Sequence, residues 1–307
     1  MVSERTPVLE IGGTHLTAAL VSHSDWSVVP GSVTRIDLHA HGTADELIAD
    51  FLRGANSLGS DHNSEWSVAM PGPFDYENGI GQFENVGKFD SLKGVNLREA
   101  LTRGIHPTPS FVHFINDADS YGVGEYAVGA AHGLDRVICI TLGTGVGSAF
   151  LVEGEPVAEG KGVAPEGEAH FLDFDGRPLE ETVSRRAIRA AYAERAQLPA
   201  GTPVDDTPDV REIADLARAG DPVAGGVMGY AFRSLGQALA DCVFDFRAQV
   251  LVIGGSMSQS WDLVEPAIRE GLALVHPELS TLQISAAERR DDAPVVGAAF
   301  WAVRHHR

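Results

Sequence analysis

Two short stretches of this sequence carry side chains that could bind hydroxyl groups. Asn116 and Asp117 follow an apolar run at 111–115 and precede a run of small residues that is typical of a helix. A carboxylate at the carboxyl end of a strand lies where α/β folds place their ligands. Asn and Asp also favour the N-cap of a helix, so a structural role is the alternative.

The second stretch contains Glu166, Glu168 and His170, two carboxylates and an imidazole within five residues. Carboxylates accept hydrogen bonds and an imidazole can donate or accept them, so together they could hold several hydroxyl groups of a polyol. A solvated loop of the same composition is the alternative.

Three glycine clusters each follow an apolar run that predicts a buried strand. Glycine adopts positive φ and lets backbone N–H groups approach a ligand, and successive N–H groups form anion-binding turns. Such loops would let an acidic chain hold phosphate without a lysine patch, although each could also be a tight hairpin turn. The second cluster is neither a P-loop nor a dinucleotide fingerprint, because no Gly-Lys-Ser/Thr follows and Ser148 stands where the last glycine belongs. The clusters are Gly12, Gly13 and Thr14; Gly143, Thr144, Gly145, Val146 and Gly147; and Gly254, Gly255 and Ser256.

The composition narrows the class of protein. The 307 residues carry a formal net charge of −20, which argues against nucleic acid or an anionic membrane as a partner. Cys139 and Cys242 are too few for a disulfide framework or a cysteine-rich zinc site. No signal peptide and no apolar run near the ~20 residues of a membrane span are visible, so we expect a soluble cytoplasmic protein.

Strands and helices alternate along the chain, which predicts an α/β fold, and the length suggests about two domains. The segments at 8–21 and 137–152 each consist of two apolar runs joined by a Gly/Thr turn, which predicts two similar hairpins. The likeness suggests a duplicated architecture, although two unrelated hairpins would look the same. Helices are predicted at 44–52, 97–103, 118–131, 179–195, 210–219, 222–246 and 294–303, a further strand at 250–253, and an exposed loop at 197–208.

In this order the motifs resemble those of the ROK family (repressors, open reading frames and kinases) of the actin-like sugar-kinase clan. The resemblance spans nearly the whole chain, with the motifs in register. The matching segments are 10–14 (Glu-Ile-Gly-Gly-Thr), 69–73 (Ala-Met-Pro-Gly-Pro), 115–118 (Ile-Asn-Asp-Ala) with Gly124 and Glu125, 142–147 (Leu-Gly-Thr-Gly-Val-Gly), 253–255 (Ile-Gly-Gly) and 297–300 (Gly-Ala-Ala-Phe).

The resemblance implies a duplicated RNase H-like fold of the actin-like, hexokinase type, with two domains and a central cleft. The expected small domain comprises residues 1–115 and is closed by the C-terminal helix within 292–307. The expected large domain comprises residues 116–291, and a homodimer is expected.

The resemblance also implies ATP-dependent transfer of the γ-phosphoryl group to a hexose, with the 6-hydroxyl of glucose as the leading acceptor. Asp117 would be the general base for the attacking hydroxyl. The sugar would be held by Gly72, Asn116, Asp117, His170, Glu180 and either Glu166 or Glu168. The phosphates would be cradled by Gly12, Gly13, Thr14, Gly143, Thr144, Gly145, Gly147, Gly254 and Gly255, with Glu10 on the side of Mg²⁺.

The sequence departs from the family pattern at three places. Glu10 stands where members usually carry Asp, which makes the carboxylate one methylene longer. Residues 171–178 contain no cysteine where members carry a zinc segment, so no zinc site is predicted, as in the polyphosphate-glucokinase branch. The family's Gly-Glu-x-Gly-His spacing would put its carboxylate at Gly167, so Glu166 or Glu168 must take that role.

Other functions are weighed against the kinase. Repressor members carry a helix-turn-helix head before the first motif, but here that motif starts by Val8 and leaves no room for one. A sugar-binding protein without catalysis would not need Asp117. Polyphosphate is the alternative phosphoryl donor, and mannose, fructose, allose and N-acetylmannosamine are the alternative sugars.

Overall fold

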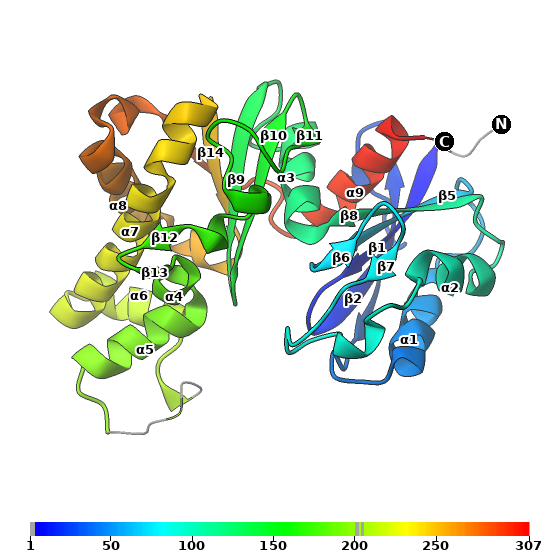
Figure 1. Cartoon of the computed structure of the whole chain (residues 1–307), viewed down its shortest axis with the longest axis horizontal. Helices are drawn as coiled ribbons and strands as arrows, with labels where there is room; N and C mark the ends of the chain where they lie inside the picture. Colours follow the sequence, from blue (N-terminus) through cyan, green and yellow to red (C-terminus); the bar gives the residue numbers. More distant parts are fainter. Residues whose placement is uncertain (1–3, 200–202, 204–205, 307) are drawn as a thin grey trace. The chain divides into compact units, whose positions relative to one another are not determined.

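The protein consists of two units, each built around one mixed β-sheet. The computed structural model describes residues 4–199, 203 and 206–306. The first unit comprises Met1–His132 and Asp291–Arg307, and the second comprises Gly133–Arg290 (Figure 1). The predicted loop at 197–208 lies in part outside the described residues.

The sheet of the first unit begins with a hairpin and continues with parallel strands. β1 (Arg5–Ile11) pairs antiparallel with β2 (His15–Ser22), and β5 (Glu65–Met70) and β8 (Phe111–Asn116) follow parallel to β1. Because β1, β5 and β8 run in one direction, their carboxyl ends meet at one edge of the sheet. β3 (Ser27–Val28) and β4 (Thr34–Asp37) both pair antiparallel with β2, and β6 (Phe74–Asp75) and β7 (Ile80–Gly81) form a separate two-stranded sheet.

Helices pack on this sheet with their apolar sides. In α1 (Ala44–Asn56) the buried residues Leu47 and Phe51 recur at helical spacing, and a capping box between Thr43 and Glu46 begins the helix. The other helices of the unit are α2 (Leu97–Gly104), α3 (Asp117–Val128) and α9 (Ala293–Arg304), with the 3₁₀ turn η1 (Asp90–Leu92).

The second unit repeats the same order of strands. β9 (Arg136–Leu142) and β10 (Val146–Val152) form an antiparallel hairpin, and β14 (Val250–Gly254) and β15 (Gln283–Ala286) follow parallel to β9. The duplicated α/β fold predicted from the two hairpins is therefore confirmed. Its further elements are β11 (Glu155–Pro156), β12 (Asp173–Phe174), β13 (Arg177–Pro178), α4 (Glu180–Val183), α5 (Arg185–Arg195), α6 (Val210–Arg218), α7 (Pro222–Phe246) and α8 (Trp261–Val275).

Two parts of the helix prediction were wrong. The single helix expected at 179–195 is interrupted at Ser184, whose extended backbone ends α4 and whose hydroxyl accepts the N–H of Ala187 to begin α5. Helix α8 was not predicted, and it carries Pro266 in its interior, a residue that normally marks a helix boundary.

Helix α3 belongs with the first unit because it packs closely on α9. A Cβ atom on Gly124 would lie 2.1 Å from the carbonyl oxygen of Ala293, and one on Gly297 would lie 1.8 Å from that of Ser120. Only glycine allows this approach. The Ser120 hydroxyl also donates to the carbonyl of Pro294 at 2.6 Å. The observed division follows His132, so that α3 and the residues after it up to 132 lie in the first unit and not beyond the predicted boundary at 115/116.

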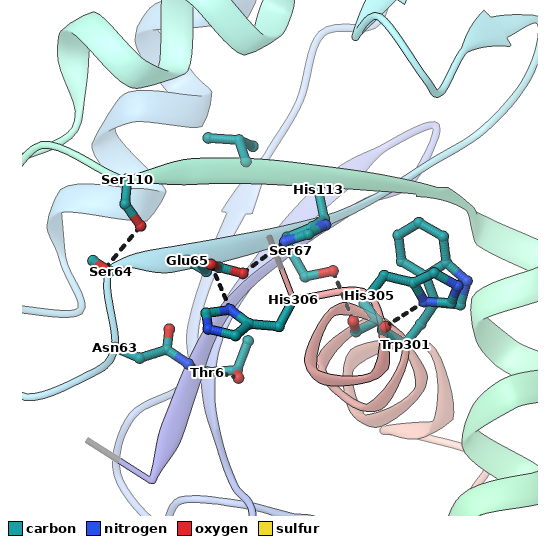
Figure 2. A network of polar contacts seen from close by, with 12 residues as sticks. Thr6, Asn63, Ser64, Glu65, Ser67, Ser110, His113, Trp301, His305 and His306 are labelled. Carbon is teal, nitrogen blue, oxygen red and sulfur yellow. Dashed lines mark hydrogen bonds and ion pairs between the residues drawn. The ribbon is translucent and has the colours of Figure 1, made fainter. Parts of the chain in front are cut away.

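A polar network holds the C-terminal segment to the amino ends of β5 and β8 (Figure 2). The carboxylate of Glu65 accepts from His113 at 2.9 Å and pairs with His306 at 2.6 Å. Nearby, the buried hydroxyl of Ser67 donates to the carbonyl of Ala298 at 2.7 Å. Glu65, Ser67 and His113 are buried, so the Glu65–His113 bond and the Ser67–Ala298 bond are made away from bulk water, whereas the His306 side chain is exposed. The buried bonds stabilise the packing of α9 on the sheet.

We expect Glu65→Gln to lower the free energy of unfolding of the first unit by about 1.5–3 kcal/mol near neutral pH, the range for a hydrogen bond to a charged group. Burial by itself raises the pKa of Glu65, but the hydrogen bonds from His306 and His113 outweigh it and hold the pKa below its ordinary value of 4.5. This contribution is complete above pH 4.5 and is lost as the pH falls through the folded pKa. The difference in melting temperature between wild type and variant should therefore shrink in that acidic range.

The matched control is Glu99→Gln, which removes an exposed ion pair with Arg103. Exposed pairs contribute only about 0.2–1 kcal/mol, so this variant should melt close to the wild type. An equal effect of the two substitutions would contradict the structural role of Glu65.

Candidate functional site

The carboxyl edge of the first sheet brings together residues that are far apart in the sequence. Glu10 of β1 pairs with Ala69 of β5, and Met70 of β5 pairs with Asn116 of β8. Gly72 follows β5, and Asp117 follows β8 as the first residue of α3. Parallel pairing therefore collects the predicted residues of this unit at one edge of the sheet.

The side chain of Asn116 is fixed by bonds on both sides. Its Oδ1 accepts the N–H groups of Ala118 at 2.8 Å and Asp119 at 3.1 Å, so it is the N-cap of α3. Its Nδ2 donates to the hydroxyl of Tyr76 at 3.0 Å, which in turn donates to the carbonyl of Met70 at 3.0 Å. The capping role is thus observed, and Tyr76 is a positioning partner that no sequence pattern indicated.

Asp117 and Glu10 form a pair of carboxylates at this edge. Asp117 Oδ1 accepts the N–H of Ala118 at 2.9 Å, and the N-terminus of α3 stabilises the negative charge of this carboxylate. Burial and, to a smaller extent, the charge of Asp117 raise the pKa of Glu10. A hydrogen bond with Thr17 and the charge of Arg35 lower it, but the pKa stays above its ordinary value. Two repelling carboxylates, one of them partly buried, fit a divalent cation that would neutralise both.

The first glycine loop holds a hydroxyl ready to donate. Because a guanidinium can only donate, Arg35 Nη2 donates to His15 Nε2 at 2.8 Å. Burial and then the charge of Arg35 lower the pKa of His15, so its neutral ring carries the proton on Nδ1 and donates to Thr14 Oγ1 at 3.1 Å. The Thr14 hydroxyl hydrogen can then be donated to a ligand such as a phosphate oxygen.

In the second unit, the predicted polyol-binding stretch contains an acid–imidazole pair. His170 Nδ1 lies 2.9 Å from Glu168 Oε2. The hydrogen bond with Glu168 raises the pKa of His170 against the opposing effect of burial, and the charges of Glu168, Glu180 and Glu166 add to it. Glu166 is exposed and has a positive φ of 58°. Glu168, and not Glu166, is therefore the carboxylate joined to His170.

Ser148 anchors this loop to the second hairpin. Its buried hydroxyl accepts the N–H of Ala169 at 2.7 Å and donates to the carbonyl of Gly167 at 2.8 Å. The residue was noted in the sequence only as a departure from a dinucleotide fingerprint. Its position directly after Gly147 connects the glycine loop with the segment that carries Glu168 and His170.

Glu180 is also joined to the second glycine loop. Its Oε2 accepts the N–H of Val146 at 3.1 Å, and a Cβ atom on Gly145 would lie 2.7 Å from that oxygen. Glycine at 145 therefore makes room for the carboxylate. By contrast, no described atom lies within 4 Å of a Cβ placed on Gly143, so that part of the loop is open.

The third glycine cluster has a structural explanation. Gly255 has a φ of 79°, and a Cβ there would lie 2.3 Å from the carbonyl oxygen of Leu142. The cluster therefore packs directly behind the second glycine loop, between β9 and the end of β14, and its second glycine is required for that packing.

Within residues 4–199, 203 and 206–306, no group of three or more His, Cys, Asp or Glu side chains has the arrangement of a metal site. The segment at 171–178 forms the small β12–β13 hairpin. No helix in the described part of the chain is both long and apolar enough to cross a membrane.

Comparisons with known proteins agree with the sequence motifs. The model of the ROK family matches residues 7–305. The chain is 26% identical to a glucokinase of Thermotoga maritima over 312 residues, covering 95% of each protein. It superposes with a TM-score of 0.75 on a ROK family glucokinase from Streptomyces griseus solved with glucose and AMPPNP, at 25% identity over 98% of this chain and 99% of that one. A ROK family transcriptional regulator, described as a homologue of the E. coli MLC protein, shares the fold at a TM-score of 0.78 and 22% identity, over 96% of this chain and 76% of that one.

We expect Ser148→Ala to loosen the loop at 166–170 without unfolding the unit. The substitution removes two hydrogen bonds, each contributing about 0.5–1.5 kcal/mol. Amide hydrogen exchange at Ala169 should then become at least about tenfold faster, which mass spectrometry of the intact fold can measure.

The matched control is Ser234→Ala in the same unit. The Ser234 hydroxyl is buried but has no hydrogen-bond partner among the residues described, so its removal should leave exchange in the loop unchanged. Equal protection of Ala169 in wild type and Ser148→Ala would mean that Ser148 does not hold the loop.

Proposed function

This chain belongs to the ROK family, and from that premise we propose that it is an ATP-dependent sugar kinase that phosphorylates a hexose hydroxyl, with the 6-hydroxyl of glucose as acceptor. The observation that carries the proposal is the Glu10–Asp117 carboxylate pair beside the glycine loop of the first unit, in which Gly13 is exposed and a Cβ atom on Gly12 would lie 3.7 Å from a Glu10 carboxylate oxygen. Phosphoryl transfer requires a positioned hydroxyl, a base and charge neutralisation, and this edge supplies residues for all three.

Asp117 is assigned as the general base that accepts the proton of the attacking hydroxyl. It is the first residue of α3, and the Asn116 cap fixes the backbone that carries it. Asn116, Gly72 and Asp117 are assigned to the sugar. Because Asn116 is held by Tyr76, its geometry is set before a ligand binds, which reduces the entropy lost on binding.

The phosphate chain is assigned to the glycine loops of the two units. In the first unit, Thr14 supplies a hydroxyl donor and Gly13 is exposed, whereas the N–H of Gly12 is already donated to the carbonyl of His15 at 2.9 Å. In the second unit, Gly143, Thr144, Gly145 and Gly147 are assigned to phosphate binding, with Gly254 and Gly255 behind them. Mg²⁺, when bound, would neutralise phosphate charge, and Glu10 is the carboxylate that would face it.

The remaining sugar hydroxyls are assigned to His170, Glu180 and Glu168. Glu168 is chosen over Glu166 because it is joined to His170, so the two side chains can present an acceptor and a donor in fixed geometry. We also propose that the protein forms a homodimer and is located in the cytoplasm.

A sugar-sensing regulator is the second candidate, since a regulator shares this fold. The acidic charge of this chain and the carboxylate at position 117 favour the kinase. Measuring ADP release over a panel of glucose, mannose, fructose, allose and N-acetylmannosamine tests the proposal, and repeating it with polyphosphate identifies the donor. If no combination of sugar and phosphoryl donor yields a phosphorylated sugar, and the protein shows a sugar-dependent gel shift on DNA, the regulator is favoured.

We expect Asp117→Asn to lower kcat by at least 10²–10⁴-fold, the usual contribution of a general base. Sugar affinity should stay within about tenfold of wild type, because the amide keeps the shape and most hydrogen bonds of the carboxylate. Steady-state ADP release and calorimetric sugar binding measure the two effects. Asp119→Asn, two residues further along α3, is the control and should keep wild-type turnover; near-normal turnover of Asp117→Asn would refute the assignment.

We expect Glu168→Gln to raise the KM for the sugar by about 5- to 150-fold, because a hydroxyl group of the sugar that covers the half-buried Glu168 would lose its charged acceptor. Glu166→Gln carries the same change in the same loop on an exposed side chain, and its KM should change less than about threefold, since surface changes alter free energy by about 0.5 kcal/mol or less. The KM for ATP should be unaffected in both. A larger effect at Glu166 would reverse the assignment.

A further inference from the structure

One lysine of this chain stands apart from the others. The sequence contains Lys88, Lys93 and Lys161. Lys93 pairs with Glu84, and Lys161 pairs with Asp245 at 3.0 Å. Lys88 makes no ion pair with any residue that the structure describes. In a chain with a net charge of −20, a lysine without a carboxylate partner is therefore a candidate to bind an anionic ligand.

The side chain of Lys88 lies against the first glycine loop. A Cβ atom placed on Gly13 would be 4.0 Å from Lys88 Cδ, and no other described atom would come within 4 Å of it. The methylenes of Lys88 are thus half-buried beside the exposed Gly13, and its ammonium group extends two bonds beyond Cδ.

The neighbouring residue fixes this placement. Phe89 is fully buried, its ring lies 5.6 Å from that of Phe83 between centroids, and its N–H donates to the carbonyl of Ala40 at 2.7 Å. Its backbone adopts a positive φ of 59°. Because Phe89 is anchored in the core, the backbone of Lys88 is held next to the loop.

The charges around the loop favour a polyanion with a cation beside it. Glu10 and Asp117 repel anions, and Arg35 is already committed to His15. A lysine ammonium is a compact charge that binds phosphate and needs no bidentate geometry. The Thr14 hydroxyl and the Lys88 ammonium would then both bind a phosphate placed at the exposed Gly13.

We propose that Lys88 binds the phosphate chain of the phosphoryl donor at the Gly12–Thr14 loop. The identification of the ligand as the phosphoryl donor rests on the proposed function. The phosphate-binding role rests on the position of Lys88 beside the loop. The ligand class is a linear phosphate chain, which a nucleoside triphosphate and inorganic polyphosphate share.

The test compares Lys88→Met with Lys93→Met, which removes a paired, exposed lysine of the same segment. Calorimetry with AMPPNP and with tripolyphosphate, in the presence of Mg²⁺, measures binding without turnover. We expect Lys88→Met to weaken binding at least tenfold and to reduce its dependence on salt, with Lys88→Arg recovering part of the loss. Lys93→Met should bind as wild type does, and all variants should share one melting temperature.

The two probes distinguish the source of the phosphate. Weakening of both assigns Lys88 to the chain that they share, and weakening of AMPPNP alone assigns it to nucleotide phosphates. Unchanged binding of both probes to Lys88→Met would overturn the inference. In kinetics, the KM for the donor should rise while the KM for the sugar stays within about twofold; a wild type that binds AMPPNP through Lys88 but phosphorylates no sugar would refute the proposed function and leave this site standing.

Discussion

The parallel pairing of β1, β5 and β8 is the constraint on which the candidate site of the first unit depends. It places Glu10, Gly72 and Asp117 at one edge although more than a hundred residues separate the first from the last. Each strand is buried along most of its length, so a slip of one residue would turn apolar side chains toward solvent or pack polar ones inside. Core packing thereby sets the register that aligns the polar strand ends.

The same edge holds two negatively charged side chains together with groups that partly offset their repulsion. Burial and the nearby Asp117 make the charged form of Glu10 costly, and Thr17 and Arg35 offset only part of that cost. Strain of this kind is typical of sites that are completed by a ligand. In the second unit the balance is reached internally, since Glu168 is bonded to His170 and Glu180 to a backbone N–H.

The sequence predicted the hairpins, the repeated architecture and the residue types at the strand ends, because these follow from local apolar patterning and glycine placement. It could not predict which of two glutamates meets His170, since that depends on the backbone at Glu166 and on the hydroxyl of Ser148, which bonds across a gap of about twenty residues. Tyr76 and Lys88 were also missed. Their roles come from long-range packing, through the bond to Asn116 and the buried Phe89, and neither leaves a periodic signal.

The close glycine packing of α3 on α9 has a consequence for how the chain is made. α9 follows α3 only after the whole second unit, so the ribosome completes that unit before it supplies the last helix of the first. Until then the faces of β1 and β5 that α9 covers, together with the small residues of α3, are without their cover. The second unit can therefore fold before the first is complete, and the first unit leaves apolar surface uncovered for longer during synthesis.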